Sequence, residues 1–293
     1  MNGTSANVIS RLHGGLGNQL FQYAVGRAVA IRTGAELLLD ARLLTDRNPF
    51  QYDLGNFRIE ARLANDDELP PARNHPIAYT WWRVLRHSPR FIREQGLGFN
   101  ERVSTIGPDC YLHGYFQSER YFAGITADLR RELSLKSDAR GDNARMAERI
   151  QGGPSVSMHI RRGDYIASAK ALSTHGSTGL AYYQRALEEI RARSGEDPVV
   201  YLFSNDPDWV RENMKLDAKL VPVAINDGRT AHEDLRLMSL CNHNVIANST
   251  FSWWGAWLNP SPGKIVAAPA QWFASLKLSN PDITPSTWLR LGD

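Results

Sequence analysis

Apolar segments alternate with amphipathic segments along the second half of the sequence, and this pattern constrains the fold more than any other feature. Five short segments have the apolar character of buried strands: Val156–Ile160, Val199–Phe203, Leu220–Val223, Val245–Ala247 and Ile265–Ala267. Four segments between them carry apolar residues at helical spacing: Tyr182–Arg193, Pro207–Met214, Glu233–Cys241 and Phe251–Leu258. Strands that alternate with helices of this length predict a doubly wound α/β domain with a parallel sheet.

The start of the chain predicts a second unit of the same kind. The order is strand, glycine-rich turn, helix and strand, over Val8–Leu12, His13–Gly17, Leu20–Val29 and Leu37–Leu39. Gly34 is expected to end the helix, because glycine is the usual residue just past a helix terminus. This βαβ pattern again favours a parallel sheet.

The middle of the chain is less regular. Prolines are frequent between residues 46 and 103, which predicts loops and short helices there. A further strand is expected around Tyr111–Tyr115, and helices over Ala127–Leu133 and Asn143–Ile150. Because Gly152-Gly153-Pro154 interrupts regular structure strongly, we expect two domains, 1–150 and 151–293.

Composition excludes several classes of protein. The 34 basic and 31 acidic residues give a net charge of +3 with no dominant Lys/Arg block, so nucleic acid is not an expected partner. Two cysteines rule out a disulfide framework and a cysteine-rich zinc site. No segment approaches the ~18 apolar residues of a membrane helix, and the polar first residues lack a signal-peptide core. We therefore expect a cytoplasmic protein.

Polar residues follow three of the predicted strands of the second domain. They are Arg161-Arg162-Gly163-Asp164, Ser204-Asn205-Asp206 and Asn248-Ser249-Thr250. In an open parallel sheet, ligands bind at the carboxyl ends of the strands. The sequence therefore predicts one binding site to which all three segments contribute.

The first of these segments has the chemistry of a diphosphate site. Strand alternation puts Val156, Met158 and Ile160 on one face of the sheet, and His159 and Arg161 on the other. The donor fork of arginine matches phosphate oxygens and would stabilise a departing diphosphate. The alternative is a surface arginine pair that is neutralised by Asp164.

The other two segments begin predicted helices. Ser249 and Thr250 precede an apolar helix, whose free amides and hydroxyls could bind phosphate, although capping alone is the alternative. The following Trp253, Trp254 and Trp257 are expected in the core. Asp206, before Pro207, is interpreted as a helix cap or a carboxylate that contacts the nucleotide base, rather than a metal ligand.

The glycine-rich turn resembles a dinucleotide fingerprint only in part. Gly15 and Gly17 match the first two glycines, but Leu20 replaces the third, which disfavours a dehydrogenase. Asp40, at the end of the second strand, could mimic an acid that binds ribose. The loop still exposes the start of a helix beside the amides of Asn18 and Gln19.

Four blocks in order give a family resemblance that covers nearly the whole chain. Together they resemble the bacterial α-1,2-fucosyltransferases of glycosyltransferase family 11. The blocks are Gly14-Gly15-Leu16-Gly17-Asn18-Gln19-Leu20-Phe21-Gln22-Tyr23-Ala24, His159-Ile160-Arg161-Arg162-Gly163-Asp164-Tyr165, Phe203-Ser204-Asn205-Asp206, and Asn248-Ser249-Thr250-Phe251-Ser252-Trp253-Trp254-Gly255-Ala256-Trp257-Leu258. The segment His113–Glu119 also resembles the family, with no role assigned.

The resemblance implies an α/β, GT-B-like fold with two Rossmann-like domains that face a central cleft. Residues 1–150 would form the acceptor-side domain and residues 151–293 the domain that binds the GDP-sugar. The implied reaction is inverting transfer of L-fucose from GDP-fucose to the 2-hydroxyl of a terminal galactose-type residue of a glycan. It implies no cofactor and no metal.

The resemblance also implies roles for individual residues. His159, Arg161 and Asp164 are expected at the catalytic centre. Donor-binding residues are expected at Gly15, Gly17, Asn18, Arg162, Ser204, Asp206, Asn248, Ser249, Thr250, Phe251 and Ser252. Asp164, Glu119 and Asp40 are the open alternatives for a general base.

Three alternatives stay open on sequence grounds. The donor could be another GDP-sugar or the linkage another one, or the protein could bind a GDP-sugar without catalysis. The segment from Arg73 to Arg93 carries five arginines and no acid among aromatic residues. Such a segment could lie on an anionic bilayer, beside a lipid-linked acceptor, or form a partly buried domain surface.

Overall fold

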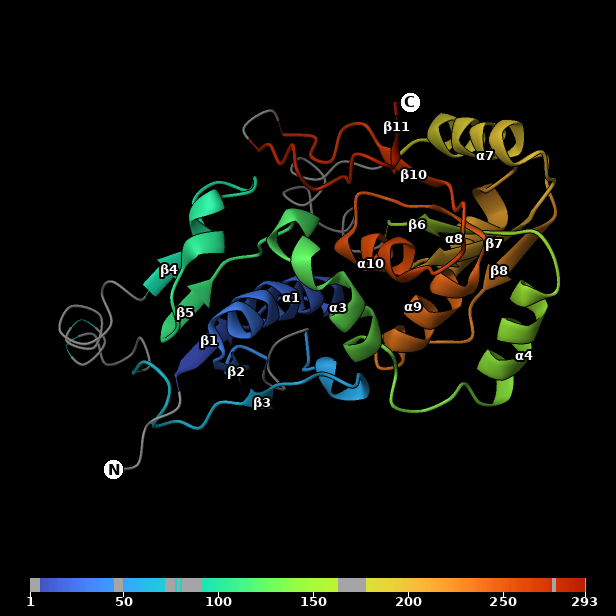
Figure 1. Cartoon of the computed structure of the whole chain (residues 1–293). Helices are drawn as coiled ribbons and strands as arrows, with labels where there is room; N and C mark the ends of the chain where they lie inside the picture. The colour runs from blue at the N-terminus through green and yellow to red at the C-terminus, as the bar shows by residue number, and fades with distance from the viewer. Residues whose placement is uncertain are drawn as a thin grey trace. The chain divides into compact units, whose positions relative to one another are not determined.

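A computed structural model describes residues 6–44, 50–71, 77, 80, 91–162, 178–275 and 278–292. The chain forms two compact units, Met1–Lys136 and Ser137–Asp293, each with its own parallel sheet (Figure 1). This architecture confirms the expected α/β class with two Rossmann-like units.

The first unit contains a five-stranded sheet in the order β3-β2-β1-β5-β4, and every strand pair in it is parallel. The strands are β1 (Asn7–Arg11), β2 (Glu36–Asp40), β3 (Arg62–Leu63), β4 (Phe91–Arg93) and β5 (Cys110–His113). The α-helices are α1 (Leu16–Thr33) and α3 (Thr126–Glu132), and the short 3-10 helices are η1 (Leu54–Asn56), η4 (Glu101–Thr105), η5 (Glu119–Tyr121) and η6 (Ala123–Ile125). The βαβ prediction is confirmed.

Helix α1 is packed tightly onto this sheet. A Cβ atom at Gly26 would lie 2.8 Å from a methyl carbon of Leu37 and 3.0 Å from Cβ of Ser10, so only glycine fits there without a shift. The helix ends as predicted at Gly34, which has a φ of 68° and donates its N–H to the carbonyls of the last turn.

The second unit contains a six-stranded parallel sheet in the order β11-β10-β9-β6-β7-β8. The strands are β6 (Ser155–Ile160), β7 (Val199–Ser204), β8 (Leu220–Val223), β9 (His243–Val245), β10 (Val266–Pro269) and β11 (Leu289–Leu291). The helices are α4 (Gly141–Gln151), α7 (Leu180–Ser194), α8 (Pro207–Asn213), α9 (Ala231–Leu240) and α10 (Thr250–Leu258).

Two hydrophobic cores lie on the two faces of this sheet. Strand β7 contributes residues to both, whereas the apolar residues of β6 lie in one. Val156, Met158 and Ile160 join the core beneath α7 and α8. His159 points to the other face, where its ring contacts Phe251, which packs against the second core. The predicted alternation along β6 is therefore confirmed.

The chain passes from the first unit to the second at Lys136–Ser137, earlier than the boundary expected after residue 150. The reason is packing, because Ile150 of α4 is completely buried in the core of the second unit, together with Leu237 of α9 and Cys241, which follows α9. Both cysteines are buried free thiols, one in each unit.

Candidate functional site

The carboxyl end of β6 is held directly to the end of β7. Ser204 lies in register with Ile160 and donates its hydroxyl to the carbonyl of Ile160 at 2.8 Å. Two residues further on, the N–H of Arg162 donates to the side-chain oxygen of Asn205 at 3.1 Å. The arginine pair therefore leaves the sheet at a fixed place, between the ends of β7 and β9.

Arg162 is also held through its guanidinium group, which lies over the ring of Trp209 with 3.6 Å between the guanidinium carbon and the ring centroid. Trp209 was not among the predicted site residues. The sequence carries one signal for Trp209 as a site residue: it is the third residue of a helix that begins directly after the predicted site residue Asp206.

His159 is buried and uncharged. Its side chain is 4% exposed, and its ring centroid lies 5.8 Å from that of Phe251. Burial, together with the positive charge of Arg161, lowers the pKa of His159 to about 3. No described residue makes a hydrogen bond to its Nδ1. A neutral imidazole of this kind can shape the site, but it cannot supply positive charge at neutral pH.

The residue before helix α10 is a serine whose side chain does not cap the helix. Ser249 occupies the N-cap position, but its hydroxyl makes no capping hydrogen bond. Its backbone carbonyl accepts hydrogen bonds from the N–H of Trp253 at 3.0 Å and from the hydroxyl of Ser252 at 3.3 Å. Asn248, also buried, donates its amide to the carbonyl of Trp272 at 3.2 Å. The helix start is thus firmly fixed, and capping does not occupy the Ser249 hydroxyl.

Asp206 does cap its helix. Its carboxylate accepts the N–H of Trp209 at 3.2 Å, and Pro207 takes the first helical position, as predicted. The N–H of Asp206 in turn donates to the Ser204 hydroxyl at 3.0 Å. Capping and contact with a nucleotide are compatible, because a carboxylate has several acceptor positions.

The glycine-rich loop of the first unit is built around side-chain amides. Gly14 has a φ of +78°, and a Cβ there would lie 2.6 Å from Nδ2 of Asn18. Gln19 donates to the carbonyls of Gly14, at 3.0 Å, and of Gln51, at 2.8 Å. The oxygen of Asn18 accepts the amide of Gln117 at 2.9 Å. Gly15 and Gly17 therefore lie in a loop whose shape these amides hold.

Asp40 is already engaged within the first unit. Arg42 binds both of its carboxylate oxygens, at 2.9 and 2.8 Å, and the hydroxyl of Tyr111 donates to it at 2.6 Å. Although its burial would raise the pKa, the bonds from Arg42 and Tyr111 outweigh it, and the pKa of Asp40 lies below its ordinary value. A carboxylate held in this way is a poor general base, and Glu119, half-buried in η5, is the described alternative.

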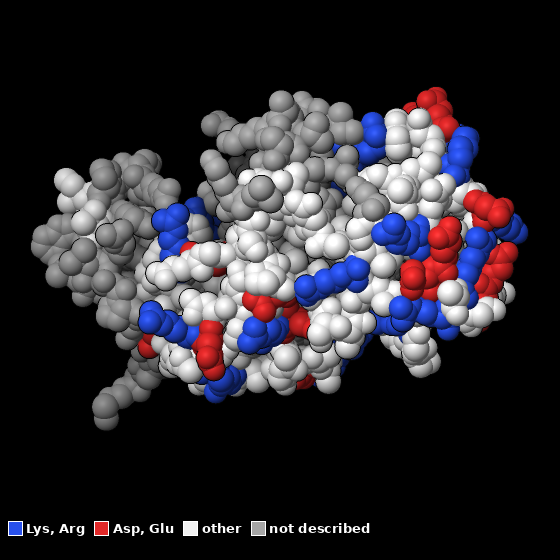
Figure 2. Space-filling model, turned by 90° about the horizontal axis from the view of Figure 1, so that it is seen from above, with Lys and Arg blue, Asp and Glu red and all other residues white. Residues whose placement is uncertain are grey.

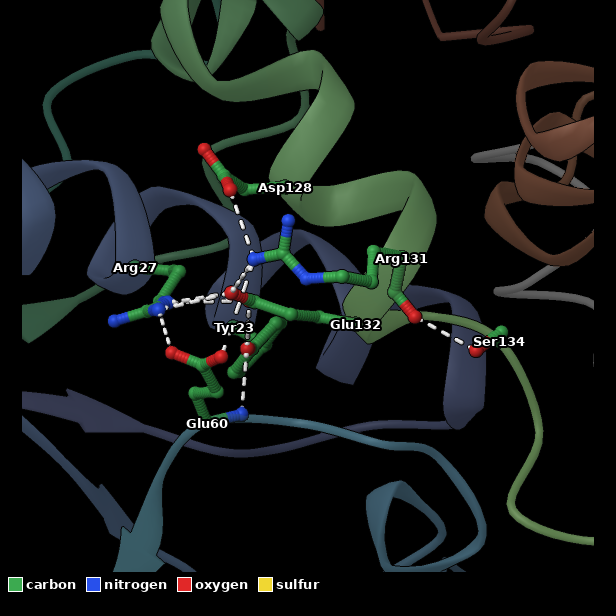
Figure 3. A network of polar contacts seen from close by, with 7 residues as sticks. All are labelled: Tyr23, Arg27, Glu60, Asp128, Arg131, Glu132 and Ser134. Atoms are coloured by element: carbon green, nitrogen blue, oxygen red, sulfur yellow. Dashed lines mark hydrogen bonds and ion pairs between the residues drawn. The ribbon is translucent and has the colours of Figure 1, made fainter.

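A buried polar network explains one further motif residue, Tyr23 (Figure 3). The Tyr23 hydroxyl donates to the carboxylate of Glu132, which is 1% exposed, and accepts the N–H of Glu60 at 3.1 Å. Arg27 binds Glu132 at 2.8 Å and also pairs with Glu60. Arg131 approaches Glu132 at 3.6 Å. Tyr23 thus anchors α1 to α3.

Two sequence predictions lie outside the described residues. Asp164 is one, and most of the arginine-rich segment 73–93 is the other. Over the described ranges, no three His, Cys, Asp or Glu side chains gather in a way that could hold a metal ion. None of the described helices has the length and hydropathy needed to cross a membrane. On the face drawn in Figure 2, acidic and basic side chains are interspersed.

Comparison with known proteins gives one consistent family. The model of glycosyl transferase family 11 matches residues 98–291. An alpha-1,2-colitosyltransferase of Escherichia coli is 32% identical over 97% of this chain and 98% of its own length. The O-antigen biosynthesis glycosyltransferase WbnK of Escherichia coli is 39% identical over 96% and 99%. A galactoside alpha-(1,2)-fucosyltransferase 1 of Rattus norvegicus is 28% identical over 84% of this chain and 61% of its own.

Solved structures agree on the fold. The alpha-1,6-fucosyltransferase NodZ, in crystals soaked with GDP-fucose, superposes with a TM-score of 0.56 at 18% identity. The superposition covers 88% of this chain and 94% of that one. The GT-B-like fold expected from the sequence is confirmed.

Proposed function

Because the chain belongs to glycosyltransferase family 11, we propose that it transfers L-fucose from GDP-fucose to the 2-hydroxyl of a terminal galactose-type residue, with inversion at the fucose anomeric carbon. The E. coli and rat relatives support the α-1,2 linkage through their names, and the rat relative supports a galactoside acceptor. The GDP-fucose complex of the NodZ structure supports the donor class.

One structural observation carries the donor half of this proposal. Arg161 leaves β6 at the point where β7 is bonded to it through Ser204, and the N-terminus of α10 follows the neighbouring strand β9. A guanidinium group, free helix amides and a hydroxyl not used for capping are the groups that bind a diphosphate. All of these groups belong to the second unit, where they follow the carboxyl ends of neighbouring strands of its sheet.

The residues divide the chemistry among them. Arg161 stabilises the negative charge that develops on the departing GDP, with Arg162 beside it. Ser249, Thr250, Ser252 and Phe251 hold the diphosphate and base region, aided by Asn248, and Asp206 contacts the nucleotide. Neutral His159 shapes the floor of the site. Gly15, Gly17 and Asn18, which belong to the first unit, are further donor-binding residues, as the resemblance implies.

Inversion requires the acceptor hydroxyl to attack the anomeric carbon from the face opposite the diphosphate. A general base within hydrogen-bond reach would take the proton of that hydroxyl. Asp164 and Glu119 stay candidates, whereas Asp40 is held by Arg42 and Tyr111. In a loose, oxocarbenium-like transition state, stabilisation of the leaving group by Arg161 outweighs the contribution of the base.

A second donor deserves a direct comparison, since one relative is named a colitosyltransferase. Colitose is fucose without its 3-hydroxyl, so both GDP-sugars present the same diphosphate. A protein that binds GDP-sugars without transfer is the remaining alternative.

The acceptor is proposed to be a glycan of the O-antigen or exopolysaccharide type, lipid-linked during synthesis, with the enzyme cytoplasmic and segment 73–93 beside the membrane.

The test is acceptor-dependent release of GDP in the presence of EDTA. The purified chain is given GDP-fucose or GDP-colitose with lactose, N-acetyllactosamine or no acceptor. Release stimulated by a galactoside in EDTA supports a metal-independent transferase, and NMR of the product then gives the linkage. If the chain binds GDP but an acceptor stimulates GDP release from neither donor, the proposed reaction is contradicted. If an acceptor stimulates GDP release from GDP-colitose alone, the donor is GDP-colitose and not GDP-fucose.

A further inference from the structure

The loop that follows strand β8 leaves the sheet of the second unit beside the candidate donor site. Val223, the last residue of β8, lies in register with Phe203 of β7, and Ser204 and Asp206 come directly after Phe203 in the chain. Because the strands are parallel, loop 224–230 starts at the edge where ligands bind in open α/β sheets. The loop leads into α9, so the first turn of α9 also lies at this edge.

One side chain of this loop, Asn226, is held by three hydrogen bonds. Its Nδ2 group donates to the carboxylate of Asp234 at 2.7 Å and to the side-chain oxygen of Asn143 at 2.9 Å, and its own oxygen accepts Nδ2 of Asn143 at 2.9 Å. Because an ionised carboxylate only accepts, the bond to Asp234 fixes which end of the Asn226 amide carries the nitrogen. The two bonds to Asn143, at the start of α4, then hold this amide in one orientation.

Helices α9 and α10 bring three different groups together at this edge of the sheet. Met238 of α9 lies so close to α10 that a Cβ at Gly255 would be 2.9 Å from the Cβ of Met238. Both helices connect parallel strands and run in the same direction, so Asp234 and Phe251, each one turn earlier, lie level with each other. The ring of Phe251 lies 5.8 Å from that of His159, whose buried Nδ1 has no hydrogen-bond partner among the described residues. A carboxylate, an aromatic ring and an unpaired ring nitrogen are therefore neighbours.

The carboxylate of Asp234 keeps one of its oxygens open. Asn226 bonds to Oδ1, and none of the described residues bonds to Oδ2. Burial raises the pKa of Asp234 to about 6, the bond from Asn226 opposes this rise, and the negative charge of Glu233 adds to it. At neutral pH the group is thus an ionised acceptor whose charge depends on the amide of Asn226.

The charged groups on the surrounding elements are engaged elsewhere. On α9, Arg236 pairs with Glu233 at 3.0 Å, and His232 lies 3.9 Å from Glu233. In the loop, the carboxylate of Asp227 accepts backbone N–H groups of the loop itself. Asp142, at the start of α4, is exposed and pairs within its own helix, and the first turn of α10 carries no charged residue. Within the described part of the chain, no cation neutralises the open carboxylate.

We propose that Asn226, locked by Asn143, is a positioning residue that aims the open oxygen of Asp234 at the base of the sugar donor, where this oxygen accepts the 2-amino group of guanine. Proteins that bind a single base read its edge with hydrogen bonds and stack a ring on its face. A carboxylate matches guanine, which presents N1–H and the 2-amino group on one edge, and does not match adenine, which has neither. The inference rests on the proposed function and deepens it, because it assigns the residues that select a GDP-sugar.

The base contact is tested by comparing the Kd of GDP with that of inosine diphosphate, which lacks only the 2-amino group. The parent chain should bind GDP at least about tenfold more tightly, because the missing bond has a charged acceptor. Asp234→Asn should lose most of this preference, since its oxygen faces Asn226 and its nitrogen cannot accept. Asp197→Asn is the matched control, because Asp197 is an exposed carboxylate of the same unit, and it should keep the parent ratio. Equal affinities of the parent for both nucleotides, or an unchanged ratio in Asp234→Asn, overturn the contact.

The positioning role is tested by the pH dependence of GDP-fucose binding, since the diphosphate of this donor is substituted at both ends and does not titrate near pH 6. The affinity of the parent should fall as the pH falls through about 6, where Asp234 gains a proton. Asn226→Ala removes the bond that lowers the pKa of Asp234, so its affinity should fall at a higher pH. Asn143→Ala should shift the profile in the same direction by less, and Asp234→Asn should abolish this dependence.

Identical pH profiles in the parent and in folded Asn226→Ala overturn the positioning role. A chain that binds neither GDP nor GDP-fucose refutes this inference together with the proposed function. A chain that binds both with the expected preference for guanine, but transfers no sugar, refutes the proposed function alone.

Discussion

The guanidinium group of Arg162 lies over the ring of Trp209, with its carbon 3.6 Å from the ring centroid. The backbone that carries the indole is itself held, because the main-chain N–H of Trp209 donates to the capping carboxylate of Asp206. A cation held over an aromatic face is stabilised by about 0.5–2 kcal/mol, depending on its exposure to water. The start of α8 thus orients Arg162, which follows strand β6.

The first prediction tests this contact. Trp209→Leu should raise KM for the GDP-sugar by about three- to tenfold, since Arg162 loses its support, and should change kcat less. Steady-state kinetics with varied donor give both values. Trp209→Phe keeps an aromatic face and should stay within about twofold of the parent. Equal donor KM values in Trp209→Leu and the parent would show that Arg162 does not depend on the indole.

Replacing Arg161 by lysine tests the leaving-group role. Arg161→Lys keeps one positive charge but loses the donor fork, so kcat should fall by about 10²-fold while the fold is retained. Arg145→Lys is the control, because Arg145 is exposed on α4 and pairs only with nearby Asp142 among the described residues. Near-normal kcat in Arg161→Lys would remove this residue from the mechanism.

The N-cap residues of α8 and α10 should respond in opposite ways. Asp206→Ala removes a capping bond and should lower the free energy of unfolding by about 1 kcal/mol. Ser249→Ala removes a hydroxyl that caps nothing, so stability should change by less than about 0.5 kcal/mol, while the Kd of GDP rises. Urea unfolding and GDP titration of both variants check this. A large loss of stability in Ser249→Ala, without a change in GDP affinity, would assign Ser249 to structure alone.

The free energy of unfolding should fall as the pH falls below the pKa that His159 has in the unfolded chain. Its pKa is near 6.5 when the side chain is free in water and about 3 in the folded protein. Between these values the unfolded chain binds a proton that the folded chain does not, so stabilisation is complete above pH 6.5 and is lost as the pH approaches 3. The slope contributed by this one group reaches about 1.4 kcal/mol per pH unit.

Urea unfolding at pH 7, 6 and 5 checks this dependence. His159→Gln removes the titrating group, so its free energy of unfolding should depend less steeply on pH than that of the parent. His13 and His243 also have lowered pKa values and contribute in the same direction, so a residual slope is expected. Identical slopes in the variant and the parent would contradict the buried, neutral state of His159.

Glu132 is predicted to matter for stability and not for donor binding. Glu132→Ala leaves Arg27 and Tyr23 without their buried partner and should cost about 3–5 kcal/mol. Asp128→Ala removes an exposed partner of Arg131 and should cost less than about 1 kcal/mol. Thermal unfolding compares the two variants. A donor KM altered in the folded fraction of Glu132→Ala would show that the network also acts on the site.

Periodicity predicted the main regular elements of the second unit well, because β6, β7, β9 and β10 are largely buried and the helices between the strands carry apolar residues at helical spacing. Strand β8 was predicted residue for residue, and β6 and β7 within one residue at an end. The short strands β3, β4 and β11 were not predicted. Each has two or three residues, and pairing with a neighbouring strand, not local pattern, makes it extended.

Boundaries failed where tertiary contacts decide them. Tyr115 was expected in a strand, but β5 ends at His113, because the backbone beyond it is bonded to Glu94. The strand expected over Val245–Ala247 is β9, which begins and ends earlier. For the candidate site, sequence alone identified Arg161, Ser204 and Ser249 at neighbouring strand ends. It could not predict that Arg162 stacks on Trp209, since this pairing joins residues far apart in the chain.

The anchoring of α1 has a practical consequence for enzyme engineering. Gln19 and Gln22 hold the glycine-rich loop from the first turns of the helix, while Tyr23 and Arg27 bind the helix to α3 from the turns that follow. A library that randomises this helix would mix loss of folding with change of specificity.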